Sequence, residues 1–228
     1  ALSLILFGSC VTGADGATVS LGFGSLPSAQ GWTYDATGPS HGSQAESSNY
    51  SVSGAILSMD TMGSALVSPS AARYIQTDVL DETNPLTISW TSRTLQDSGG
   101  TYGFGVAATV AGEQYSAGFE TDKISFENGA SIILDTTSFH TYRIEATPGS
   151  LTYKFFVDGA LSATPTTLTE AQNGVISGLN RVLFGDLTGG ANSETDLSSF
   201  QFTQVPEPSL SVLLGIGGLA LSVRRSRR

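Results

Sequence analysis

The chain is short of cysteine, histidine and charge, and each shortage excludes a class of protein. It contains a single cysteine, Cys10, so neither a disulfide framework nor a thiolate metal site can hold the domain together. The two histidines, His41 and His140, have no histidine or carboxylate four residues away, so the sequence supports no zinc site of helical spacing. Charged residues make up 13% of the chain, fewer than a helical bundle needs.

Basic residues are scarce ahead of the C-terminal tail. Four of the 10 basic residues and one of the 20 acidic residues lie after residue 204, which leaves 6 basic and 19 acidic side chains in residues 1–204. A domain this acidic repels phosphate backbones, so nucleic acid is excluded as a partner.

The body of the chain is rich in two-residue alternation. Tyr142, Ile144 and Ala146 alternate with polar residues, and a second alternating run spans residues 151–158. Pro148-Gly149 between them suits the central positions of a type II turn. The pattern predicts an antiparallel hairpin here and another at Asn128-Gly129, between residues 123–127 and 131–134.

Further short runs follow the same rule, and no stretch of the body carries a long apolar stripe at helical spacing. Residues 35–54, rich in Gly, Ser, Pro and Asn, indicate a long loop. About a dozen short strands with one apolar face predict one all-β domain over residues 18–204, either a two-sheet sandwich or a barrel. The other expected strands are residues 73–80, 86–91, 102–110, 115–119, 182–184 and 198–204.

Four segments narrow that choice. Residues 139–144 read Phe-His-Thr-Tyr-Arg-Ile, residues 157–159 read Val-Asp-Gly, and residues 182–186 and 196–200 each contain an aspartate and a phenylalanine. Together they resemble the final strands of concanavalin A-like jelly rolls of the laminin-G type. The resemblance covers about a third of the chain and implies a two-sheet antiparallel jelly-roll sandwich.

The N-terminal 17 residues are typical of the remnant of a secretory signal peptide. Residues 1–10 are almost wholly apolar or small, and Gly13, Ala14 and Ala17 offer small residues for cleavage. Cys10 could instead be a lipoprotein acceptor, although Phe7 stands three residues before it where leucine is preferred. Both interpretations predict export.

The C-terminal residues 205–228 combine three features in order. Val205-Pro206-Glu207-Pro208 forms a rigid break, residues 209–223 form a 15-residue apolar run, and four arginines close the chain: Arg224, Arg225, Arg227 and Arg228. The run predicts a short transmembrane helix whose arginines snorkel into the headgroups. The positive-inside tendency then keeps the arginines cytoplasmic and places the body on the outer side of the membrane.

This tail resembles the PEP-CTERM sorting signal of Gram-negative bacteria. The resemblance implies recognition by an exosortase, a transient stay in the inner membrane, and delivery to the cell surface or an extracellular matrix. The alternative is an ordinary tail anchor with incidental prolines.

No catalytic residue can be assigned from the sequence. Glycosidases on a jelly roll present two glutamates and an aspartate on one strand, but the nearest pairs, Glu120 with Asp122 and Glu194 with Asp196, lack a third member. A binding or structural role is therefore expected rather than catalysis. A secreted glycoside hydrolase or lyase remains the alternative, because two carboxylates can come from different strands.

Exposed aromatic residues offer a carbohydrate site. Trp32 and Tyr34 would stack on sugar rings, and Asp35 would accept hydrogen bonds from the hydroxyl groups of an extracellular polysaccharide. Trp32 and Tyr34 lie two residues apart and share a face, however, and in a sandwich that shared face is usually the core. Both interpretations stay open at this stage.

Calcium is the one cofactor that the sequence raises. The segment from residue 186 to residue 196 gathers oxygen ligands suited to Ca²⁺ in one expected loop: Asp186, Asn192, Glu194 and Asp196. The alternative is a solvated acidic loop, since the spacing matches no EF-hand.

Overall fold

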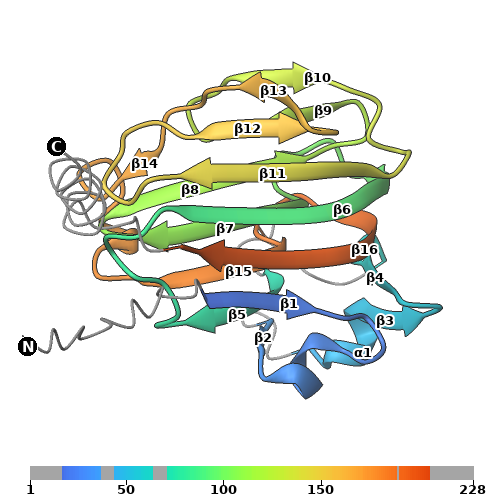
Figure 1. The fold of residues 1–228 in the computed structure, drawn as a ribbon. Helices are drawn as coiled ribbons and strands as arrows, with labels where there is room; N and C mark the ends of the chain where they lie inside the picture. Colours follow the sequence, from blue (N-terminus) through green and yellow to red (C-terminus); the bar gives the residue numbers. More distant parts are fainter. Residues whose placement is uncertain (1–16, 37–43, 64–70, 189, 206–228) are drawn as a thin grey trace, which may run out of the picture.

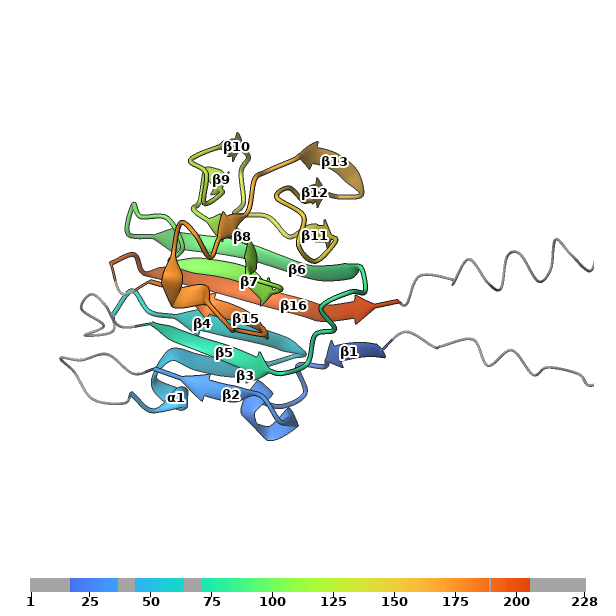
Figure 2. The same cartoon turned by 90° about the vertical axis from the view of Figure 1, so that its left-hand side faces the viewer.

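A computed structural model describes residues 17–36, 44–63, 71–188 and 190–205 of the chain. The described part is an all-β sandwich of two antiparallel sheets, consistent with a jelly roll, as the sequence predicts. Figure 1 shows the two layers, and Figure 2 shows the same molecule turned by 90°. The predicted helix over residues 209–223 lies outside the described residues, among which no helix is long and apolar enough to cross a membrane.

Within the described residues, the two sheets have eight strands each. In spatial order, sheet A contains β13 (Ala160–Ala163), β12 (Lys154–Val157), β11 (His140–Ala146), β6 (Leu86–Asp97), β16 (Ser193–Gln204), β4 (Ile56–Asp60) and β3 (Tyr50–Ser53), and β1 (Ala17–Leu21) also pairs with β16. Sheet B contains β10 (Ser131–Ile133), β9 (Lys123–Ser125), β8 (Glu113–Phe119), β7 (Phe104–Val110), β15 (Arg181–Asp186), β5 (Ala72–Thr77) and β2 (Thr33–Asp35), and β14 (Leu168–Thr169) also pairs with β8.

The first and last described strands are neighbours. Ala17 pairs with Gln204 and Leu21 with Phe200, so the start of β1 and the end of β16 lie side by side at one edge of the molecule (Figure 2). The described part of the chain also contains three short helical turns: η1 (Pro27–Gln30), α1 (Glu46–Asn49) and η2 (Gly174–Ile176).

Aromatic side chains from both sheets form the core. Trp90, on β6, packs edge to face against Phe119 of β8 with ring centroids 5.8 Å apart. Phe184, on β15, lies 4.6 Å from Phe200 of β16. Their burial removes large apolar areas from water, which is the main favourable contribution to folding.

Both predicted hairpins are confirmed. Strands β11 and β12 pair with Ile144 opposite Phe155, and Gly149 in the connection has the positive φ of +75° that its turn requires. Strands β9 and β10 pair around Gly129, whose φ is +80°. The second arm of the first hairpin is shorter than expected, because β12 begins only at Lys154.

The prediction of a loop over residues 35–54 was wrong in part. Strand β3 and helix α1 occupy residues 46–53, and Tyr50 is buried with its hydroxyl donating to the carbonyl oxygen of Ala72 at 2.6 Å. Composition misled here because one buried tyrosine fixes a segment that is otherwise polar. The strand expected from residue 102 begins at Phe104 instead, since Tyr102 takes a φ of +70° that no strand accommodates.

Candidate functional site: a groove on the outer face of sheet B

A row of glycines thins the outer face of sheet B, the face turned away from sheet A. Gly105 of β7 pairs with Gly118 of β8 on one side and with Gly185 of β15 on the other. The ring of Tyr102 lies over this row. A Cβ atom at Gly118 would come within 2.7 Å of Tyr102 Cδ1, and one at Gly105 within 2.7 Å of Leu187 Cδ1. Glycine at these positions is therefore what lets Tyr102 and Leu187 approach the sheet.

Tyr102 is held in an unfavourable backbone conformation. Its φ of +70° costs on the order of 1–3 kcal/mol for a residue other than glycine. Its hydroxyl lies 3.2 Å from Ser116 Oγ, and burial raises the pKa of the phenol well above its usual range. The glycine row and this hydrogen bond together hold the ring in place.

Beside Tyr102 lies a hollow with a volume of about 180 Å³, which we call the outer groove. Ala107 and Leu183, neighbours across β7 and β15, line it with small apolar surface. The side chains around it come from four strands and three loops. They are Arg73, Tyr102, Ala107, Gln114, Glu127, Arg181, Leu183, Leu187 and Thr188.

One side of the outer groove presents a carboxylate in a hydrogen-bonded network. Glu127 Oε1 accepts a hydrogen bond from Gln114 Nε2 at 3.1 Å and another from Ser116 Oγ at 3.3 Å. Ser116 is fully buried, so it supports Glu127 from behind. This network fixes the carboxylate of Glu127 toward the groove.

Two arginines, Arg73 and Arg181, supply the positive charge of the outer groove. Arg73 donates from Nε and Nη2 to Asp35 Oδ2, at 3.1 and 2.9 Å. Arg181 has no ion pair among the described residues, and its buried Nε has no hydrogen-bond partner there. Burial, and to a lesser degree the nearby charge of Arg73, lowers the pKa of the Arg181 guanidinium, and the charge of Asp35 opposes this shift only in part.

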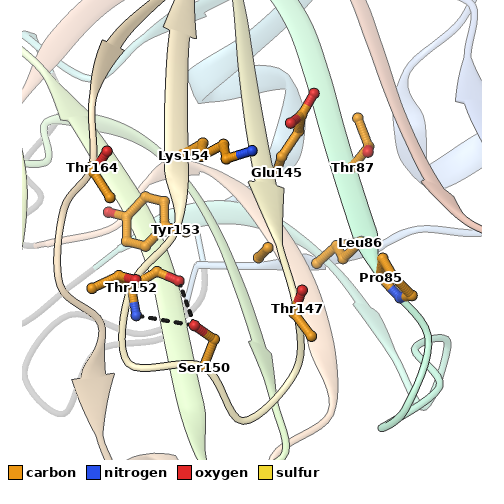
Figure 3. Close-up of a pocket in the computed structure, with 11 residues that line it drawn as sticks. Pro85, Leu86, Thr87, Glu145, Thr147, Ser150, Thr152, Tyr153, Lys154 and Thr164 are labelled. Carbon is orange, nitrogen blue, oxygen red and sulfur yellow. Dashed lines mark hydrogen bonds between the residues drawn. The ribbon is translucent and has the colours of Figure 1, made fainter.

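A second hollow, of about 390 Å³, lies beside β6, β11 and β12 of sheet A (Figure 3). Threonine and serine side chains line much of it, and Ser150 Oγ bonds to the backbone of Thr152. Its carboxylate, Glu145, is paired with Arg143 at 3.0 Å, and Tyr153 bonds through its hydroxyl to the carbonyl oxygen of Ser116. Ser150, Glu145 and Tyr153 thus have partners, whereas Arg181 of the outer groove has no hydrogen-bond partner for its buried Nε among the described residues, so the outer groove is the stronger candidate for a ligand site.

The structure places Trp32 and Tyr34, the two aromatic residues of the possible carbohydrate site, against the core. Trp32 is 4% exposed and packs edge to face against Phe184 and Phe200, at 5.2 and 5.5 Å. Tyr34 packs against aromatic rings of the core as well. Trp32 and Tyr34 therefore do not form an exposed stacking surface, as the core interpretation of their shared face predicts. Asp35 points the other way and pairs with Arg73 of the outer groove.

The four residues expected to hold calcium each lie in different surroundings and have different hydrogen-bond partners. Asp186 is fully buried, and burial raises its pKa to about 8. Asp196 accepts from Arg93 at 2.8 Å and from Ser58 at 2.6 Å, while Glu194 accepts from Gln96 at 3.1 Å. The backbone nitrogen of Asn192 donates to Ser98 Oγ. Within the described ranges, no three acidic, histidine or cysteine side chains form a metal-binding group, so the expected gathering of these residues is not observed.

The sorting motif can be placed only at its first residue. Val205 follows β16 and is 54% exposed. Pro206, Glu207, Pro208 and the arginines Arg224, Arg225, Arg227 and Arg228 lie outside the described residues. Their role stays a prediction.

Sequence reasoning missed the residues that form the outer groove. Gly105 and Gly118 stand at the polar positions of two alternating runs, which is a signal that these positions face away from the core. Only the strand register shows that they are neighbours. Arg181 and Glu127 lie 54 positions apart in the sequence and carry no motif.

Similar solved structures share the fold. The laminarinase of Rhodothermus marinus matches with a TM-score of 0.54 at 16% identity, covering 85% of this chain and 99% of that one. The β-glucanase of Bacillus licheniformis matches with a TM-score of 0.50 at 16% identity, covering 84% and 99%. A sialidase matches with a TM-score of 0.53 at 13% identity over 82% of this chain, which spans only 18% of the sialidase.

No family-wide sequence model and no curated protein matches the chain. The structural likeness therefore defines the fold class, the concanavalin A-like β-sandwich that includes glucanases, and nothing finer.

Proposed function

We propose that the β-sandwich binds a glycan in the outer groove. The observation that carries this proposal is the groove itself, in which a fixed carboxylate, an amide and an arginine without a partner among the described residues surround a small apolar surface. Sugars present hydroxyl donors and acceptors around an apolar ring, and convergent polar groups in a hollow suit them. The laminarinase and β-glucanase among the structural neighbours are named for action on polysaccharides, which supports the same ligand class.

A glycoside hydrolase or lyase is the second candidate, and the fold is equally compatible with it. Glycosidases use two carboxyl groups about 5–10 Å apart. Among the described residues that line the outer groove, Glu127 is the one carboxylate. This single carboxylate favours binding over hydrolysis.

We propose further that the protein is exported and that residues 205–228 direct it to the cell surface or extracellular matrix through an exosortase. The order of the prolines, apolar run and arginines in the sequence supports this destination. An exosortase gene in the same genome is the observation that tests it. Without such a gene, the tail would be an ordinary anchor.

A glycan array probed with the full chain, with and without Ca²⁺, tests the binding role. Retention of at least one glycan class is expected, and replacing Glu127 with Gln should weaken it about 10-fold through loss of a charge-assisted hydrogen bond. No signal in either condition would refute glycan binding. Incubation with polysaccharides and measurement of new reducing ends tests hydrolysis, and we expect none.

A further inference from the structure

The outer groove concentrates positive charge in a domain that has little. Residues 1–204 contain six basic side chains, and two of them, Arg73 and Arg181, line this one hollow. Arg73 is paired with Asp35. Three other cations form ion pairs elsewhere in the described structure: Arg93 with Asp196, Lys123 with Glu120 and Arg143 with Glu145.

Arg181 differs from these because no acidic side chain among the described residues forms an ion pair with it, and Asp35, already paired with Arg73, acts on it only through a longer-range attraction. It is partly buried, and its Nε is removed from water without an acceptor from that part of the chain. A guanidinium stays protonated in proteins, so it cannot relieve this cost by losing its charge. A desolvated charged donor of this kind is stabilised by a ligand that brings the missing acceptor.

The chemistry of that acceptor follows from the shape of the guanidinium. Its planar fork matches the paired oxygens of a carboxylate or a sulfate better than a single hydroxyl group. Glu127, which lines the same groove, favours a hydrogen-bond donor instead, because its carboxylate accepts hydrogen bonds and repels a second anion. A ligand that satisfies both must carry an acidic group at one end and hydroxyl donors at the other.

We propose that the outer groove binds an anionic saccharide unit, with its carboxylate or sulfate on Arg181 and its hydroxyl groups on Glu127 and Gln114. This inference rests on the proposed glycan binding and names its substrate class. The volume of about 180 Å³ is well below the roughly 300–1,000 Å³ of drug-sized pockets, which suits one sugar residue of a chain. The acidic remainder of the domain repels an anionic polymer, so recognition depends on this local arginine.

Calorimetric titration of the full chain tests the proposal with four probes. These are a tetramer of galacturonic acid, a sulfated tetrasaccharide, a neutral galactose tetramer, and inorganic sulfate. At least one acidic tetrasaccharide should bind 10-fold or more tightly than the neutral tetramer. Equal affinity for the neutral tetramer would overturn the anionic preference while leaving glycan binding intact. Binding of no saccharide would overturn both, and equal binding of inorganic sulfate would reduce the groove to a simple anion site and refute the proposal.

Variants assign the effect to Arg181. Arg181→Gln should weaken the acidic tetrasaccharide about 10- to 100-fold, the range expected for one charge-assisted hydrogen bond, and should weaken the neutral tetramer far less. Arg143→Gln, on the outer face of sheet A, is the matched control and should change neither. Arg181→Lys keeps the charge without the fork and should weaken binding several-fold. If Arg181→Gln does not fold by circular dichroism, an unchanged affinity in Arg181→Lys overturns the proposal.

Discussion

Asp186, at the end of β15, is a carboxylic acid in the interior of the sandwich. Its side chain is fully buried, and its Oδ1 accepts a hydrogen bond from the backbone nitrogen of Thr188 at 3.0 Å. Burial raises its pKa from 3.8 to about 8, since the charged form loses its hydration. The folded protein therefore binds a proton here that the unfolded chain has already released at neutral pH.

This raised pKa makes stability depend on pH. Below pH 4 both states are protonated; between about pH 4 and pH 8 the folded state alone holds the proton, so the free energy of unfolding falls by up to about 1.4 kcal/mol per pH unit. Asp186→Asn removes this dependence and should gain stability over the wild type steadily from pH 5 to pH 8. Urea denaturation at each pH measures the gain. Glu82→Gln, at an exposed position, is the control and should show the same dependence of stability on pH as the wild type. If the stability of Asp186→Asn also varied with pH as the wild type does, the raised pKa of Asp186 would be contradicted.

At the scale of elements, the strand pair β7–β8 determines the shape of the outer groove. Gly105 and Gly118 lie opposite one another, and the ring of Tyr102 occupies the space that two side chains would fill. Along the same strands, Phe104, Val106, Ala117 and Phe119 are buried in the core. This strand pair thus presents bulky side chains to the core, and at Gly105 and Gly118 it presents no side chain to the opposite face.

Gly118→Ala tests this arrangement. The added Cβ would meet the ring and backbone nitrogen of Tyr102 at 2.7–2.9 Å, so we expect a loss of about 1–3 kcal/mol of stability from overpacking together with weaker glycan binding. Gly24→Ala is the control, because a Cβ there meets nothing within 4 Å, and its effect should stay within about 0.5 kcal/mol. Equal urea midpoints for the two variants would show that the Tyr102 ring moves aside without any loss of stability.

At the scale of the whole molecule, aromatic contacts join the two sheets. Trp32 touches Phe184 of sheet B and both Phe200 and Phe202 of sheet A, with ring centroids 5.2 to 6.4 Å apart. It lies just before β2, in a segment that composition alone would leave on the surface. Its burial helps to fix the N-terminal part of sheet B against the centre of sheet A.

Trp32→Ala therefore separates the two interpretations of this residue. As a core residue, its loss should cost about 3–5 kcal/mol and lower the melting temperature by several degrees. Leu161→Ala, at a position 56% exposed on β13, should leave the melting temperature nearly unchanged. Unaltered stability with lost glycan binding would instead restore the exposed platform.

Local patterns predicted the parts of this fold that depend on local physics. Alternation identified the buried face of β6 and β11, and the Pro148-Gly149 and Asn128-Gly129 pairs located two hairpins, because turn geometry and strand period are properties of a few adjacent residues. Helix α1 and strand β3 were missed, since their formation depends on Tyr50 entering a core assembled from distant strands.

The sequence by itself determined the strand-rich composition, the shortage of cysteine and cations, and a tail whose pattern predicts a destination. Tertiary structure alone decided which face each residue serves: it buried Trp32 and Asp186, separated Asp196 from the expected metal loop, and brought Arg181 to the same groove as Glu127. The physical reason is strand register. Pairing between strands distant in the chain sets which side chains meet, and no local pattern encodes it.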